Sequence, residues 1–147
     1  MDVIVDDHLL LRVLLDEEPP ELRLPGARVF ATGLWYHRLC RAINNPSVAG
    51  VMSRSLGRAV PAVAKSALQS ITYLPDTVGL LSLRELAWPM ARLLDEGVRL
   101  NLMSLEALAA AEHLGAELCL AAADENPPLI EAAVARGIPT RLVPEGA

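Results

Sequence analysis

The sequence predicts an α/β protein with three layers, in which a doubly wound, mostly parallel sheet is flanked by helices. Short apolar runs alternate along the chain with longer stretches in which apolar residues recur at helical spacing. Strands that alternate with helices pair in parallel, because each helix returns the chain to the start of the next strand. The 147 residues are enough to bury a core, so we predict a single domain over residues 1–147.

The first half of the chain contains two predicted strands and several helices. Val3 to Val5 is a continuous β-branched run, typical of a central strand buried on both faces. A helix follows it directly and ends before the charged loop DEEPPE. A second short strand is predicted at 28–31. Further helices are predicted at 32–43, 47–56 and 61–72, with Gly57 separating the last two.

The second half alternates more regularly between strands and helices. Val78 to Leu81 is a predicted strand. Ser82, followed three residues later by Glu85, forms a capping box that opens a helix reaching about Glu96. The later predicted elements are a helix at 103–114, a strand at 117–121, a helix that starts at Pro127 with Asn126 as its cap, and a strand at 140–143.

Charge is distributed unevenly along the chain. The formal net charge is −5, which argues against a general binder of polyanions. Between Glu21 and Asp76 there is no acidic residue, and seven basic residues give this segment +7, so the rest of the chain carries −12. Two interpretations stay open: the basic segment binds phosphate groups or an acidic partner, or the two parts of the chain pack against each other.

The composition also restricts the location of the protein. No apolar run approaches the roughly 18 residues that a membrane span requires, and the N-terminus MDVIVDD lacks the positive region of a signal peptide. Cys40 and Cys119 lie 79 positions apart without a C-x-x-C motif, which is typical of thiols in a reducing compartment. We therefore expect a cytoplasmic protein that does not enter a membrane.

Three acidic residues stand at positions where a doubly wound sheet collects ligands. Asp6 ends the first strand, and Asp124 follows the strand at 117–121. Ligands bind at the carboxyl ends of parallel strands. Glu106 lies in the first turn of the helix at 103–114, where an acid commonly only complements the helix dipole. If the three converge, their oxygen ligands suit Mg²⁺ or Mn²⁺.

The sequence around these acids resembles a PIN domain of the kind found in VapC toxins of toxin–antitoxin pairs. The resemblance rests on the segments VIVDDHLLLRVLL and MSLEALAAAEHLGAELCLAAAD and on the order of the elements. It implies a Mg²⁺- or Mn²⁺-dependent endoribonuclease with Asp6, Glu106 and Asp124 as catalytic metal ligands. It also implies a homodimer and an antitoxin as partner. Asp7 or Glu125 could belong to an outer shell, although we expect Asp7 to face solvent and His8 to be only a helix-start residue.

Arg38 is the main departure from the family pattern. The family has a glutamate in its second helix, and this chain has Arg38 in the corresponding stretch RLCRA. A guanidinium can pair bidentately with carboxylates and repels a divalent cation. One hypothesis is therefore a ribonuclease with a weakened metal site. The other is an inactive PIN-like module that binds RNA or protein, in which Arg38 replaces the metal. A third alternative is that Arg38 lies elsewhere because the helix register is off by a turn.

In both hypotheses the basic segment supplies contacts to RNA or to a partner. We predict Arg41, Arg54 and Arg58 as contact residues.

Overall fold

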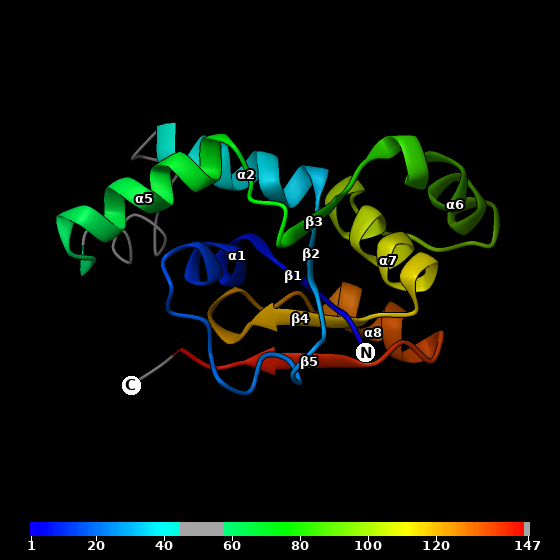
Figure 1. Ribbon diagram of the computed structural model, residues 1–147. Helices are drawn as coiled ribbons and strands as arrows, with labels where there is room; N and C mark the ends of the chain where they lie inside the picture. The colour runs from blue at the N-terminus through cyan, green and yellow to red at the C-terminus, as the bar shows by residue number, and fades with distance from the viewer. Residues whose placement is uncertain (45–57, 146–147) are drawn as a thin grey trace.

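A five-stranded, wholly parallel sheet forms the centre of the protein. The computed structural model describes residues 1–44 and 58–145. The strands are β1 (Val3–Val5), β2 (Val29–Thr32), β3 (Val78–Leu81), β4 (Glu117–Ala121) and β5 (Thr140–Val143). They lie in the order β3-β2-β1-β4-β5 (Figure 1). The predicted α/β class is confirmed, and all five predicted strands are present within one residue of their expected positions.

Helices cover both faces of the sheet, which makes the fold three-layered. Alternate residues of a strand face opposite sides, and β1 follows this rule: Val3 and Val5 belong to one apolar cluster and Ile4 to the other. The first cluster includes residues of α1 (Asp7–Leu14), α2 (Gly33–Asn44) and α5 (Pro61–Thr72). The second includes residues of α6 (Leu83–Asp95), α7 (Leu102–Leu114) and α8 (Pro127–Ala135).

Local signals in the sequence place most helix ends correctly. Ser82 and Glu85 form the predicted capping box of α6. Asn126 caps α8, where its side-chain oxygen accepts a hydrogen bond from the Leu129 backbone N–H. Gly115 ends α7 with φ +62°, a left-handed conformation that glycine adopts without steric cost. The helix predicted at 47–56 lies outside the described residues.

Helix α7 is buried along most of its length. All eight residues from Ser104 to Ala111 are buried. Four of them are alanines, and small side chains allow a helix to pack closely on several sides; α7 contacts α6, α8 and the sheet. Glu106 stands in this apolar run, so its carboxylate is enclosed by the fold.

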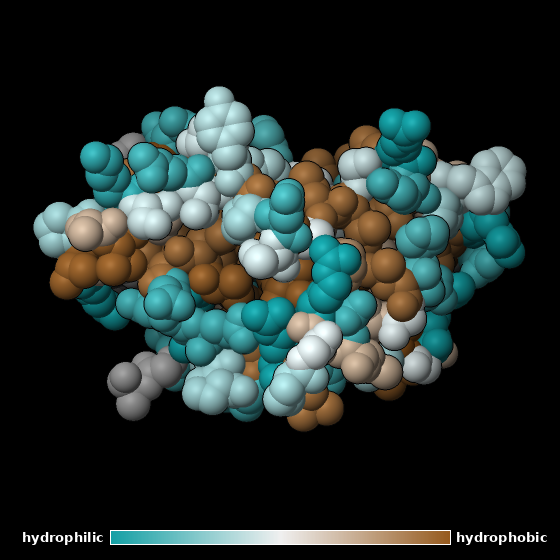
Figure 2. Space-filling view, viewed as in Figure 1, coloured by the Kyte–Doolittle hydropathy of each residue, from teal (hydrophilic) through white to brown (hydrophobic). Residues whose placement is uncertain are grey.

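The surface mixes polar and apolar areas. In Figure 2, apolar surface is visible over the region of α5 and again toward α6 and α7, with polar side chains between these areas. Among the described residues, none of the helices combines the length and apolar character needed to cross a bilayer.

Strand order determines where the acidic residues meet. The chain moves outward in one direction from β1 to β2 and β3, and in the other from β4 to β5. The switch between the two directions lies between β1 and β4, whose carboxyl ends form the crevice where doubly wound folds bind ligands. Asp6 directly follows β1, and Asp124 ends the short 3-10 helix η1 (Ala122–Asp124) that follows β4.

Candidate functional site

Asp6 links the start of α1 to strand β4. The residue is 2% exposed. Oδ1 accepts a hydrogen bond from the Leu9 backbone N–H at 2.9 Å, and Oδ2 accepts one from the Ala121 backbone N–H at 2.8 Å. Burial raises the pKa of Asp6 to about 6, against the lowering effect of these two N–H groups. Both carboxylate oxygens of Asp6 thus accept hydrogen bonds from backbone N–H groups.

Asp7 pairs with Arg38 across the gap between α1 and α2. The Asp7 side chain is fully buried, so the expectation that it faces solvent is wrong. Side chains in a helix lean toward its N-terminus, which brings this first-turn residue to the carboxyl edge of the sheet. The Nε of Arg38 donates to Oδ2 of Asp7, and one terminal nitrogen donates to Oδ1 at 2.6 Å. This bidentate pair, opposed by desolvation, raises the pKa of Arg38 above its ordinary value.

Asp124 joins the same network from the end of β4. The terminal nitrogen of Arg38 that reaches Asp7 also donates to Oδ2 of Asp124 at 2.8 Å. His8 places its Nε2 3.3 Å from that oxygen. Of the three acids that Arg38 was expected to neutralise, its guanidinium pairs with Asp124 in the described structure, and its other partner is Asp7, which was expected to face solvent. Asp6 is not among its ion-pair partners in the described structure.

The side chain of Glu106, a residue of α7, lies against the beginning of α2. Its Oε1 accepts a hydrogen bond from the Leu34 backbone N–H at 2.7 Å, and its residue is 1% exposed. A carboxylate at a helix N-terminus is stabilised by unpaired N–H groups and by the helix dipole. In this chain the helix that Glu106 complements is α2, which is remote in sequence from its own helix α7.

The metal site expected from Asp6, Glu106 and Asp124 stays a prediction. A cation needs ligand atoms that converge, and Asp6 and Glu106 direct oxygens to separate backbone N–H groups. Within residues 1–44 and 58–145, the group able to hold a metal is Asp7, His8 and Asp124, whose ligand atoms lie within 4.8 Å of one another. The catalytic and metal-binding roles of Asp6 and Glu106 stay predictions, and these contacts give them no support.

The predicted contact residues take no part in the ion pairs of this network or lie outside the described structure. Arg41 on α2 and Arg58, just before α5, are exposed, and Arg54 is outside the described residues. Lys65 on α5 is also exposed. Within the described part of the chain, Arg41, Arg58 and Lys65 form no ion pair.

The sequence analysis did not identify Thr32, an uncharged polar residue at this edge of the sheet. Thr32 ends β2 and is completely buried. Its hydroxyl is the one buried side-chain polar atom without a hydrogen-bond partner among the described residues. Its position at the carboxyl end of a predicted strand, the same feature that identified Asp6, could have marked it as a candidate site residue.

Comparison with known proteins adds no further constraint. No protein-family model matches this sequence, and no curated protein matches it. The residues and their geometry are therefore the basis for assigning a function.

Proposed function

We propose that this protein is a PIN-like module of the VapC kind that binds RNA without cleaving it, with the guanidinium of Arg38 in place of a divalent cation. The observation that carries the proposal is the Arg38 network. One side chain pairs with the fully buried Asp7 and with Asp124 at the switch point of the sheet. A cation brought to these acids would have to displace a bidentate ion pair.

The energetic cost of that displacement favours the guanidinium. Removing one partner of a buried ion pair leaves an uncompensated buried charge, which lowers the free energy of unfolding by about 3–5 kcal/mol. Arg38 stays cationic, because the hydrogen bonds that it donates to the Asp7 carboxylate raise its pKa. A divalent cation close to this positive charge would also be repelled. The chain itself thus already supplies a cation to this acidic edge.

The unpaired basic residues support RNA as the ligand. Arg41, Arg58 and Lys65 are exposed on or next to the neighbouring helices α2 and α5, and the described part of the chain offers them no acidic partner. Phosphate groups of single-stranded RNA bind such cations with release of counterions. Arg41 lies three positions after Arg38 on α2, but within the described structure it forms no ion pair with the acids of the Arg38 network.

The second candidate is a Mn²⁺- or Mg²⁺-dependent endoribonuclease. The observation that favours it is the convergence of Asp7, His8 and Asp124 within 4.8 Å. These three residues would hold the ion once Arg38 had moved, and a bound cation would activate water for attack on a phosphodiester. The imidazole ligand makes Mn²⁺ the better fit, since Mg²⁺ prefers oxygen alone.

Calorimetric titration with Mn²⁺ separates the two candidates. We expect no binding to the wild type and measurable binding to Arg38→Gln, because the variant removes the positive charge that pairs with the acids. Mn²⁺ should also raise the melting temperature of Arg38→Gln, and adding Asp124→Asn to that variant should abolish the effect. Mn²⁺ binding by the wild type, with RNA cleavage that Asp124→Asn removes, would instead support the ribonuclease.

Fluorescence anisotropy with a short single-stranded RNA tests the binding surface. The double variant Arg41→Ala/Lys65→Ala should bind more weakly and reduce the slope of log affinity against log salt by about 0.7 for each phosphate that is no longer neutralised. Arg84→Ala is the matched control, because Arg84 is also exposed but lies on α6. The proposal fails if the wild type does not bind RNA, or if the control weakens binding as much as the double variant.

A further inference from the structure

Helix α6 carries more apolar surface than the core of the protein covers. The helix lies at one end of the molecule (Figure 1), and Leu86, Met90 and Leu93 bury its inner side. Residues three or four positions apart share one face of a helix. Beside the buried row, such a spacing forms a second apolar row that is exposed and that we call the α6 stripe: Leu83, Ala87, Ala91 and Leu94.

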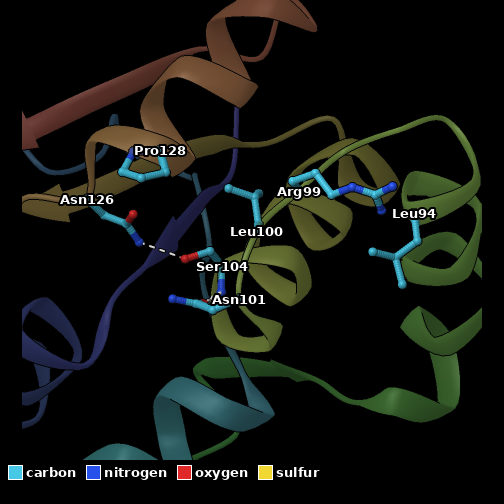
Figure 3. A pocket seen from close by; sticks show the side chains of 7 residues that line it. All are labelled: Leu94, Arg99, Leu100, Asn101, Ser104, Asn126 and Pro128. Carbon is cyan, nitrogen blue, oxygen red and sulfur yellow. Dashed lines mark hydrogen bonds between the residues drawn. The ribbon is translucent and has the colours of Figure 1, made fainter.

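The exposed apolar surface continues beyond the α6 stripe. Trp88 lies on its flank and is 75% exposed. Leu94 lines a hollow together with Leu100 of the loop before α7 (Figure 3), and the exposed Leu102 begins α7. Apolar side chains that gather on the surface of a folded protein mark an interaction site.

The charges beside the α6 stripe are of both signs. Arg84 and Asp95 lie on the same flank as Trp88, because eleven positions are close to three helical turns. Both are exposed, and within the described part of the chain neither forms an ion pair. A partner with one sign of charge, such as a nucleic acid or an acidic peptide, would be attracted to one of them and repelled by the other. The surface therefore fits a partner that itself carries both signs.

The order of residues in the α6 stripe is self-complementary. Two copies of a helix packed antiparallel about a two-fold axis bring the beginning of one helix to the end of the other. With the axis at the middle of α6, Leu83 faces Leu94 of the second copy, and Ala87 faces Ala91. The small alanines let the two helices approach closely at the centre, and the leucines fill the space at both ends.

The same arrangement also pairs the charges. Arg84 of each copy faces Asp95 of the other, and the two Trp88 rings lie on the same flank near the axis. We infer that the α6 stripe is the contact surface of a symmetric dimer of this protein, with the two α6 helices antiparallel. This surface follows from the residues of α6 and does not depend on the proposed RNA binding.

Sedimentation equilibrium of the full chain over a series of concentrations tests this surface. We expect the wild type to dimerise, and Ala91→Glu to raise the dissociation constant of the dimer by about 100-fold or more, because each copy would bury an unpaired carboxylate. Position 91 is exposed in one copy alone and glutamate is a good helix former, so the variant should stay folded. Val134→Glu is the matched control: Val134 is exposed on α8, outside the stripe, and its replacement should not change the dissociation constant.

Charge reversal tests the antiparallel pairing itself. Arg84→Asp and Asp95→Arg should each raise the dissociation constant by about 10-fold, because each variant places like charges opposite one another. The double variant Arg84→Asp/Asp95→Arg should return the dissociation constant to within about 3-fold of the wild type. An acid at the start of a helix and a base at its end are both stabilised by the helix dipole, so these variants should not weaken α6.

Two kinds of result would overturn the inference. One is a wild type that stays monomeric at about 100 μM, because the stripe then has no affinity for a second copy in this range. The other is a dimer that Ala91→Glu leaves intact, or one in which the double charge reversal does not restore what each single reversal removes. Far-UV circular dichroism of each variant shows that a loss of the dimer is not a loss of the fold.

Discussion

Each buried acid in this protein has a different structural partner. Asp6 accepts from two backbone N–H groups, Asp7 pairs with Arg38, and Glu106 complements the start of α2. A buried carboxylate without such a partner would cost several kcal/mol. The acids that a sequence pattern marks as catalytic are therefore also required by the fold, and their replacement will affect stability as well as any activity.

The ionisation of Asp6 should make the stability of the protein depend on pH. Its pKa is raised by burial to about 6 in the folded state, from an ordinary value of 3.8. The stability that Asp6 contributes is therefore complete below about pH 4 and is lost as the pH rises through about 6. We expect urea unfolding to show that the wild type loses up to about 3 kcal/mol relative to Asp6→Asn between pH 4 and pH 7. A difference that does not change with pH would contradict this.

The unpartnered hydroxyl of Thr32 predicts a stabilising substitution. Thr32→Val removes a buried donor and acceptor and keeps the shape of the side chain, so the free energy of unfolding should rise by about 1 kcal/mol. Thr72→Val is the control: the hydroxyl of Thr72 donates to the Leu68 carbonyl at an exposed position, and no gain is expected there. Urea titration measures both. A loss of stability in Thr32→Val would mean that the hydroxyl has a partner in solution.

At the scale of the elements, β2 and β3 pack against each other through an aromatic ring. Phe30 pairs with Gly79 in the parallel register. A Cβ placed on Gly79 would lie 2.3 Å from Cδ1 and Cε1 of the Phe30 ring, which is closer than atoms can approach. Arg28 covers the same ring, with its guanidinium carbon 4.9 Å from the ring centroid. Gly79 thus provides the space in which the ring lies across the sheet.

Gly79→Ala should weaken the pairing of β3 with β2. We expect a loss of about 1–3 kcal/mol, because the added methyl forces the ring from its position. The double variant Gly79→Ala/Phe30→Ala should lose less than the sum of the two single variants, since the clash is then absent. Gly33→Ala serves as the control, because its nearest contacts would be an ordinary 3.8 Å and 3.9 Å. Additive losses in the double variant would exclude the clash.

At the scale of the whole molecule, Arg38 connects three segments that are distant in sequence. It joins α2 to α1 over 31 positions and to η1 over 86 positions. These contacts close the carboxyl edge of the sheet at its switch point. The ion pair is therefore part of what holds the N-terminal and C-terminal halves together.

A double-mutant cycle on Arg38 and Asp7 measures this connection. Arg38→Gln should destabilise the protein by about 2–4 kcal/mol, somewhat below the value for fully buried pairs, because the Arg38 side chain is 33% exposed. Arg38→Gln combined with Asp7→Asn should lose about 1–2 kcal/mol less than the sum of the single variants.

The matched control for this cycle is Arg136→Gln. Arg136 also bridges two acids and is 27% exposed, but Glu96 and Glu112 lie near the surface. Its loss should cost no more than about 1 kcal/mol. An equal cost for the two arginines would mean that the buried position of Asp7 does not matter.

The class of the fold and most element boundaries follow from local patterns in the sequence. The β-branched run at Val3 to Val5, the capping residues Ser82 and Asn126, and Gly115 all act through local preferences that neighbours in the chain reveal. The sequence analysis also identified Arg38 as a basic residue that would lie among the acids at the carboxyl edge of the sheet. These features depend on spacing and side-chain type, which are visible without coordinates.

The contacts between individual side-chain atoms, in contrast, follow from the three-dimensional packing of distant segments. The sequence pattern predicts Asp6, Glu106 and Asp124 at one edge of the sheet. In the structure, the Asp6 carboxylate accepts hydrogen bonds from the backbone N–H groups of Leu9 and Ala121. The Glu106 carboxylate accepts one from the backbone N–H of Leu34. Asp7, expected to face solvent, is instead buried against Arg38. The physical reason is that the contacts of a carboxylate depend on angstrom-scale positions of elements distant in the chain, and a pattern of residue types does not specify them.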